Sequence, residues 1–112
     1  MNILLLGITN NAFIKSIKSI KNVTITESFI EKPVLYPFPN IVIVDFEKAT
    51  STNDNEKVLT EIATHIVPKP YIIACMAKWD PSYKTLAKCF GVNRIFTYED
   101  NEELSYIIEK LT

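Results

Sequence analysis

The chain alternates between short segments dense in aliphatic residues and longer segments in which apolar and polar residues recur at helical spacing. Residues 2–8 (NILLLGI), 41–46 (IVIVDF) and 71–76 (YIIACM) are continuous apolar runs, a pattern typical of strands buried on both faces. The alternation around Val23 and Ile25 predicts a further short strand, and residues 94–98 predict another. The pattern therefore indicates five strands.

Apolar residues three and four positions apart predict four amphipathic helices, over residues 11–21, 53–66, 81–90 and 100–111. We expect Asn10 or Asn11 to cap the first helix, Asn53 or Asp54 the second and Asp80 the third. Gly91 is predicted to end the third helix in a left-handed conformation. Asp100 and Glu103 resemble a capping box for the last helix.

Two intervening segments carry no helical pattern. Residues 47–55 read as a polar loop after the second continuous apolar run. Residues 28–40 (SFIEKPVLYPFPN) contain Pro33, Pro37 and Pro39, which leave room for at most one turn of helix. We therefore expect a loop where a regular α/β alternation would place a helix.

Strands that alternate with helices in this order predict an α/β fold in one domain, residues 1–112. Right-handed crossovers place the strands in an open, doubly wound, five-stranded parallel sheet of order 2-1-3-4-5, a flavodoxin-like or receiver-like architecture. The first and last helices then share one face of the sheet.

The composition of the chain excludes several classes of function. A net charge of −1 provides no large electrostatic field, so we expect no direct binding of nucleic acid and no binding to a membrane surface. The only glycines are Gly7 and Gly91, which excludes the glycine-rich phosphate loops of Rossmann and P-loop proteins. The opening apolar run is too short to span a membrane. Cys75 and Cys89 are expected to be buried reduced thiols, and a cytoplasmic location follows.

The predicted topology and three segments resemble the receiver domains of two-component response regulators. The segments are residues 39–45 (PNIVIVD), 77–80 (AKWD) and 90–96 (FGVNRIF), the last followed by 101–104 (NEEL). The resemblance covers essentially the whole chain. It implies that Asp45, at the end of the third strand, occupies the position of the aspartate that accepts phosphate.

The other functional positions of that family differ in this chain. The acidic pair that holds Mg²⁺ falls on Gly7 and Ile8, the hydroxyl residue on Met76, and the phosphate-binding lysine on Tyr98. Phosphoryl transfer to Asp45 needs a cation and charge stabilisation, which these residues do not supply. We therefore predict a degenerate receiver, or pseudo-receiver, with no catalytic residue, metal or cofactor, which acts by docking to proteins.

Two alternatives remain open for the site. Asp45 could still accept phosphate in an atypical receiver, or it could be a strand-end carboxylate that neighbouring N–H groups cap or that pairs with Lys48 or Lys78. A different class is a flavodoxin-like ligand-binding protein or small enzyme that uses the crevice above Gly7, Asp45 and Met76.

Candidate interaction residues lie on two predicted surfaces. The first helix carries a basic row that includes Lys15 and Lys18, which in receivers meets the kinase partner, whereas residues 99–109 are acidic. The second surface, formed by the third helix, the last strand and the last helix, carries aromatic and basic residues: Trp79, Tyr83, Lys88, Tyr98 and Tyr106. Receivers often form homodimers through that face. The expected partners are a signalling kinase, a regulatory protein or a second copy.

Overall fold

The computed structural model describes residues 1–111 and contains five strands, all parallel, in the order β2-β1-β3-β4-β5. The strands are β1 (Asn2–Leu6), β2 (Thr24–Ser28), β3 (Ile41–Asp45), β4 (Tyr71–Met76) and β5 (Arg94–Thr97). The helices are α1 (Asn11–Lys18), α2 (Phe46–Ala49), α3 (Asn53–His65), α4 (Ser82–Cys89), the 3₁₀ helix η1 (Tyr98–Asp100) and α5 (Asn101–Leu111). The predicted strand order is confirmed.

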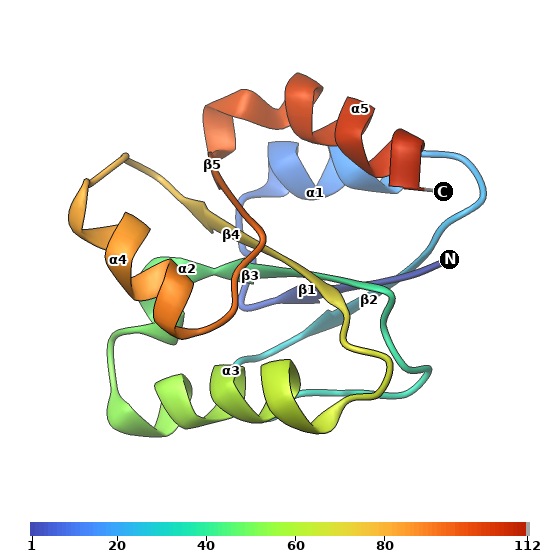
Figure 1. The fold of residues 1–112 in the computed structure, drawn as a ribbon. Coiled ribbons are helices and arrows are strands. Elements are labelled where there is room, and N and C mark those ends of the chain that lie inside the picture. Colours follow the sequence, from blue (N-terminus) through green and yellow to red (C-terminus); the bar gives the residue numbers. More distant parts are fainter. Residues whose placement is uncertain (112) are drawn as a thin grey trace.

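The sheet is the middle layer of three (Figure 1). Helices α1 and α5 cover one face, as predicted, and α3 covers the other face together with α2 and α4. Successive residues of each strand face opposite layers, so Ile43 packs toward α1 and α5 while Val44 packs toward α3. Every residue of β3 is buried, which explains its continuous apolar sequence.

The segment between β2 and β3 contains no helix, as its prolines predicted. Ile30 is buried in the core layer beneath α3, and Leu35 packs against the same layer. The following polar segment differs from the prediction, because residues 46–49 form the short helix α2 and not a loop. Asp45 caps this helix, and Thr52, not Asn53 or Asp54, caps α3 through its bond from the Asn55 amide.

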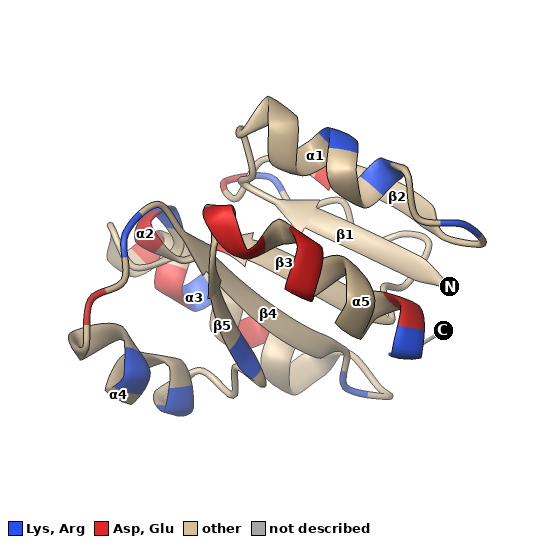
Figure 2. Ribbon diagram, turned by 90° about the horizontal axis from the view of Figure 1, so that it is seen from above, with Lys and Arg blue, Asp and Glu red and all other residues tan. Residues whose placement is uncertain are grey.

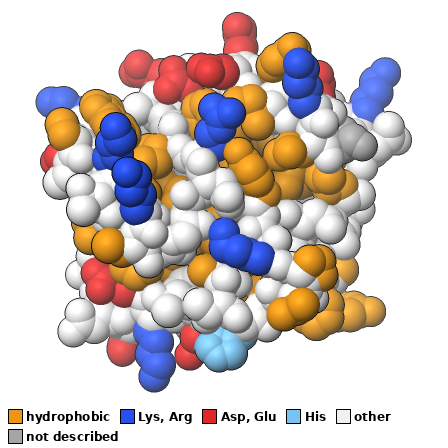
Figure 3. Space-filling model, viewed as in Figure 1, with side chains coloured by type: hydrophobic (Ala, Val, Ile, Leu, Met, Phe, Trp, Pro, Cys, Tyr) orange, Lys and Arg blue, Asp and Glu red, His pale blue; other side chains and the backbone are white. Residues whose placement is uncertain are grey.

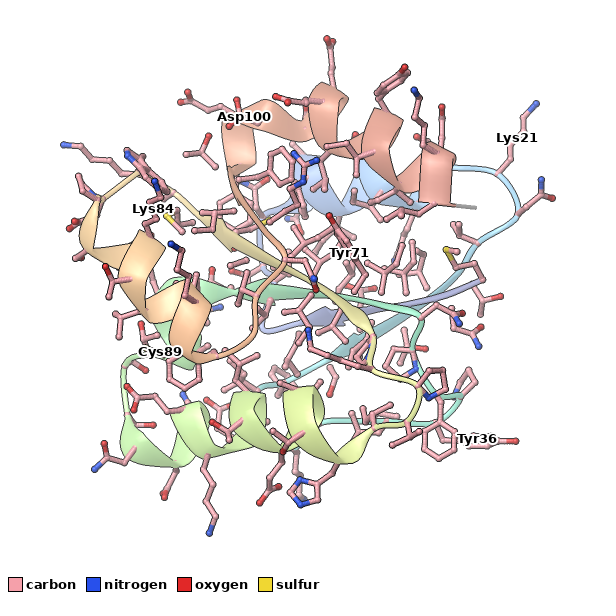
Figure 4. All side chains as sticks on the ribbon, in the orientation of Figure 1. Lys21, Tyr36, Tyr71, Lys84, Cys89 and Asp100 are labelled. Carbon is pink, nitrogen blue, oxygen red and sulfur yellow. The ribbon has the colours of Figure 1, made fainter. Side chains whose placement is uncertain are left out.

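The starts of the last two helices each need one correction. The residue at the N-cap position of α4 is Pro81, not Asp80, although the Asp80 side chain accepts a hydrogen bond from the Ser82 amide at 2.9 Å. Gly91 has the predicted left-handed backbone (φ +71°), but the capping box before α5 joins Thr97 and Asp100, not Asp100 and Glu103, because η1 precedes the helix. Cys75 is buried as expected, whereas Cys89 is exposed on α4, where Figure 4 labels it. Cys89 is the last residue of α4 and lies on the face of this amphipathic helix that is exposed to solvent.

One structural finding bears on membranes. Within residues 1–111, none of the helices combines the length and apolar content that a membrane-spanning helix requires.

Candidate functional site

Asp45 lies at the carboxyl end of β3, where the ends of β1, β4 and β5 converge. Its side chain is 9% exposed, and both carboxylate oxygens accept hydrogen bonds from the chain itself. The Lys48 amide donates to Oδ1 at 2.9 Å, and the Tyr98 hydroxyl donates to Oδ2 at 2.5 Å. The carboxylate is therefore held on one side by the first turn of α2 and on the other by the residue that follows β5.

The Tyr98 side chain is partly buried at the other end of this bond. Its ring packs edge-on against Phe13 of α1, with ring centroids 5.2 Å apart. Burial raises the pKa of Tyr98 far above its ordinary value, and the hydrogen bond to Asp45 and the negative charge of Asp45 raise it further. The phenol therefore stays protonated and donates to Asp45.

Lys48 brings a positive charge to the carboxyl end of β1. Its Nζ donates to the Gly7 carbonyl oxygen at 2.8 Å and to Thr9 Oγ1 at 3.3 Å. The neighbouring Glu47 accepts a bond from the Ala77 amide at 3.0 Å, which ties α2 to the end of β4. Helix α2 thus connects three strand ends around Asp45.

Gly7 has a backbone conformation that other residues rarely adopt, with φ +71°. Its amide donates to the Ser28 carbonyl at 2.8 Å, which holds this conformation at the end of β1. A Cβ at this position would make only ordinary contacts, the nearest at 3.6 Å, so the constraint is conformational and not spatial. The position therefore favours glycine over most residues with a Cβ for a reason of backbone geometry.

We expect the Gly7→Ala variant to lose about 1–2 kcal/mol of unfolding free energy, the usual cost of a left-handed conformation for a residue with a Cβ. Urea titration followed by circular dichroism measures the loss. Gly7→Asn is the matched control, because asparagine tolerates this conformation better and should lose less. Equal stability of Gly7→Ala and the parent chain would contradict the conformational explanation.

The residues beside Asp45 on β4 belong to the core. Met76, at the position of the family's hydroxyl residue, is fully buried, and so is Cys75. Burial raises the pKa of the Cys75 thiol well above its ordinary value, and the charges of Asp45 and Asp100 add to this shift. Cys75 therefore stays a protonated thiol and is a poor nucleophile.

The predicted interaction residues occupy different environments. Trp79 is 47% exposed and lines a groove of about 360 Å³ with three cations, Lys84, Lys88 and Arg94. Figure 3 shows basic side chains over α4 and β5 and acidic ones around the start of α5. Tyr83 faces inward instead, with its ring edge-on to Phe46 at 5.4 Å.

The remaining candidates lie around α1 and α5. Tyr106 is 58% exposed, and the Lys110 ammonium lies 4.7 Å from the centre of its ring. The two helices lie side by side, joined by a contact of 3.4 Å between Ser16 Oγ and Ser105 Oγ. Figure 2 shows the opposite charges on the two helices, and Lys15 is exposed on α1. Lys18 is paired with Glu27 of β2 at 2.7 Å, not with α5.

Comparison with known proteins identifies the fold. No protein-family model and no curated protein matches the chain. Among solved structures, the crystal structure of a response regulator in red light signaling of R. palustris matches with a TM-score of 0.57 and 15% sequence identity. The match covers 99% of this chain and 91% of that chain. The chain has a receiver-like fold.

The receiver-like fold implies a Mg²⁺ site beside Asp45, and the residues present do not fit one. Mg²⁺ prefers several oxygen ligands, often carboxylates. Gly7 and Ile8 supply no carboxylate at the end of β1, and the Lys48 ammonium lies there instead. Within residues 1–111, no group of three or more His, Cys, Asp or Glu side chains is placed to hold a metal ion.

Sequence reasoning did not assign the bridging role of Lys48. A signal was available, since an aspartate followed by Phe46-Glu47-Lys48-Ala49, without glycine or proline, is compatible with a capped helix start. The capped helix brings the Lys48 amide to Asp45. The path of its side chain to the Gly7 carbonyl depends on tertiary packing and has no counterpart in the local sequence.

Proposed function

We propose that this chain is a pseudo-receiver, a non-catalytic signalling or regulatory module that acts by docking to a protein partner and not by Mg²⁺-dependent phosphorylation. The observation that carries the proposal is the pair of hydrogen bonds on Asp45, in which each carboxylate oxygen accepts a donor from the chain. In this arrangement the carboxylate is a structural link between α2 and the end of β5.

Electrostatics at the end of β1 support the same proposal. Phosphoryl transfer to a carboxylate requires a free oxygen for attack and a cation that neutralises the charge developing on the phosphoryl group. Tyr98 occupies Oδ2, and the Lys48 ammonium repels a divalent cation from the strand ends. The pseudo-receiver would therefore hold one state whatever the supply of phosphodonor.

A protein partner is the proposed source of regulation. The groove of Trp79, Lys84, Lys88 and Arg94 combines an exposed aromatic ring with three positive charges, features common in protein interfaces. The acidic start of α5 lies on the same face of the molecule as these basic side chains (Figure 3). A signalling kinase, a regulatory protein or a second copy of the chain would meet complementary charge here, in the cytoplasm.

Exposure to acetyl phosphate and Mg²⁺, followed by intact mass measurement, tests the proposal against an atypical receiver. We expect no mass increase by one phosphoryl group, while a phosphorylatable receiver in the same tube becomes modified. Beryllium fluoride should likewise leave the amide resonances around Asp45 and Tyr98 unshifted. A phosphoryl mass that appears on the parent chain and not on Asp45→Asn would overturn the pseudo-receiver proposal.

A further inference from the structure

A cavity of about 420 Å³ opens between the carboxyl ends of β1 and β2, beside the Asp45 site, with which it shares Gly7 and Lys48. Its walls come from three segments: residues 7–9 after β1, residues 27–31 around the end of β2, and Lys48 of α2. We propose that this cavity binds a small zwitterion of the α-amino acid class with an apolar or aromatic side chain. The inference goes beyond the docking function and does not depend on it.

The positive charge in the cavity lining is that of Lys48. Its ammonium donates to two neutral oxygens, the Gly7 carbonyl and Thr9 Oγ1, which leaves one of its three N–H groups free. The Thr9 hydroxyl accepts from Lys48, so its own proton is free to be donated. A ligand carboxylate placed here would accept one bond from each group, and the bond from Lys48 would be charge-assisted.

The negative charge available in the cavity lining is that of Glu31. Two carboxylates line the cavity, but Glu27 is already paired with Lys18 at 2.7 Å. Glu31 is exposed and makes no ion pair within residues 1–111. Its carboxylate is therefore available to a ligand ammonium.

The apolar part of the cavity comes from Ile30 and Phe29. Ile30 is fully buried at its base, while Phe29, on the rim, is 77% exposed. A network at Ser28 fixes this wall, since its hydroxyl donates to the Lys32 carbonyl at 3.0 Å and accepts from the Val34 amide at 2.8 Å. An apolar ligand side chain would cover the Phe29 ring and remove its surface from water.

Charge balance distinguishes a zwitterion from a simple anion or cation. Lys48 and Glu31 are the unpaired charges of the cavity lining, one of each sign, because the charge of Glu27 is compensated by Lys18. A simple anion would satisfy Lys48 and be repelled by Glu31, and a simple cation would meet the reverse. The volume lies within the range of about 300–1,000 Å³ that is usual for small-molecule sites.

A titration with L-phenylalanine, followed by amide NMR shifts of the full chain, tests the proposal. We expect shifts at Gly7, Thr9, Phe29, Glu31 and Lys48. The matched compounds 3-phenylpropionate and phenethylamine each lack one charge and should bind at least about tenfold more weakly, the effect of losing one charge-assisted hydrogen bond. L-Leucine should also bind, because the apolar wall does not require a ring.

Substitutions of Lys48 and Glu31 test the role of each charge. Lys48→Met and Glu31→Gln should each weaken L-phenylalanine binding at least about tenfold, whereas Lys57→Met and Glu61→Gln on the exposed surface of α3 should leave it unchanged. Glu31 is exposed, so Glu31→Gln keeps the fold and the test stands if Lys48→Met is unstable. The proposal is overturned if neither amino acid shifts the cavity amides at millimolar concentration, or if either single-charge compound binds as well as L-phenylalanine.

Discussion

Replacing Phe46 by alanine is expected to lower the free energy of unfolding by about 3–5 kcal/mol, the usual cost of deleting a buried aromatic side chain. Phe46 is fully buried at the start of α2. Its ring packs edge-on against Tyr83, at 5.4 Å between centroids, and against Phe90, at 6.3 Å. One ring thus joins α2 to α4, and its loss leaves a cavity that these neighbours do not fill.

Thermal and urea unfolding, followed by circular dichroism, measure the effect. The matched control is Phe38→Ala in the loop before β3, where the ring is 67% exposed and its removal should change stability by no more than about 0.5 kcal/mol. Comparable losses in the two variants would show that burial of Phe46 does not stabilise this layer.

The Tyr98→Phe variant is expected to lose about 1–2 kcal/mol of stability near neutral pH, because the substitution leaves the buried Oδ2 of Asp45 without its donor. The aromatic ring and its packing on Phe13 are kept, so the change isolates the hydroxyl. Tyr106→Phe is the control, since the Tyr106 side chain is mostly exposed on α5 and its substitution should have little effect.

The raised pKa of Tyr98 also predicts how the stability of the chain changes at alkaline pH. The pKa of Tyr98 is raised in the folded chain above its ordinary value of 10.0, mainly by burial and then by its contacts with Asp45. Above pH 10 the unfolded chain loses this proton while the folded chain keeps it, so the unfolded state is favoured as pH rises. The contribution of Tyr98 is therefore complete below pH 10 and is lost as pH increases toward the folded-state pKa.

Urea midpoints measured from pH 7 to pH 11 test this sign. The parent chain should lose stability steeply at the alkaline end, and Tyr98→Phe should lose less over the same interval. The buried Cys75 thiol, whose pKa is also raised, adds a decline of the same sign in both proteins. Parallel curves for the two proteins would show that Tyr98 does not contribute.

Local sequence patterns sufficed to predict the sheet. Continuous apolar runs such as residues 41–46 identified buried strands, and three prolines excluded a helix between β2 and β3. The strand order followed from the alternation of strands and helices, because crossovers between parallel strands are right-handed. The short helix α2 was missed because four residues give too brief a periodicity to recognise.

The site could be predicted only in part. The position of Asp45 at a strand end followed from the sequence, but its bond to Tyr98 joins residues 53 positions apart across β4. The sequence pattern placed Tyr98 at the end of the last strand, and it cannot specify that the hydroxyl turns toward Asp45. The prediction for Cys89 was wrong. Its residue type suggested burial, but the residue lies exposed at the end of α4.

The crossover from β2 to β3 has a consequence for the entropy of the unfolded chain. A helix in this place would be ordered by its own hydrogen bonds, whereas residues 29–40 are ordered largely by the burial of Ile30 and by the network at Ser28. Pro33, Pro37 and Pro39 each restrict one backbone angle before folding begins, so the segment has less conformational freedom to lose. The smaller entropy loss on folding thus compensates in part for the stability that a helix would have supplied here.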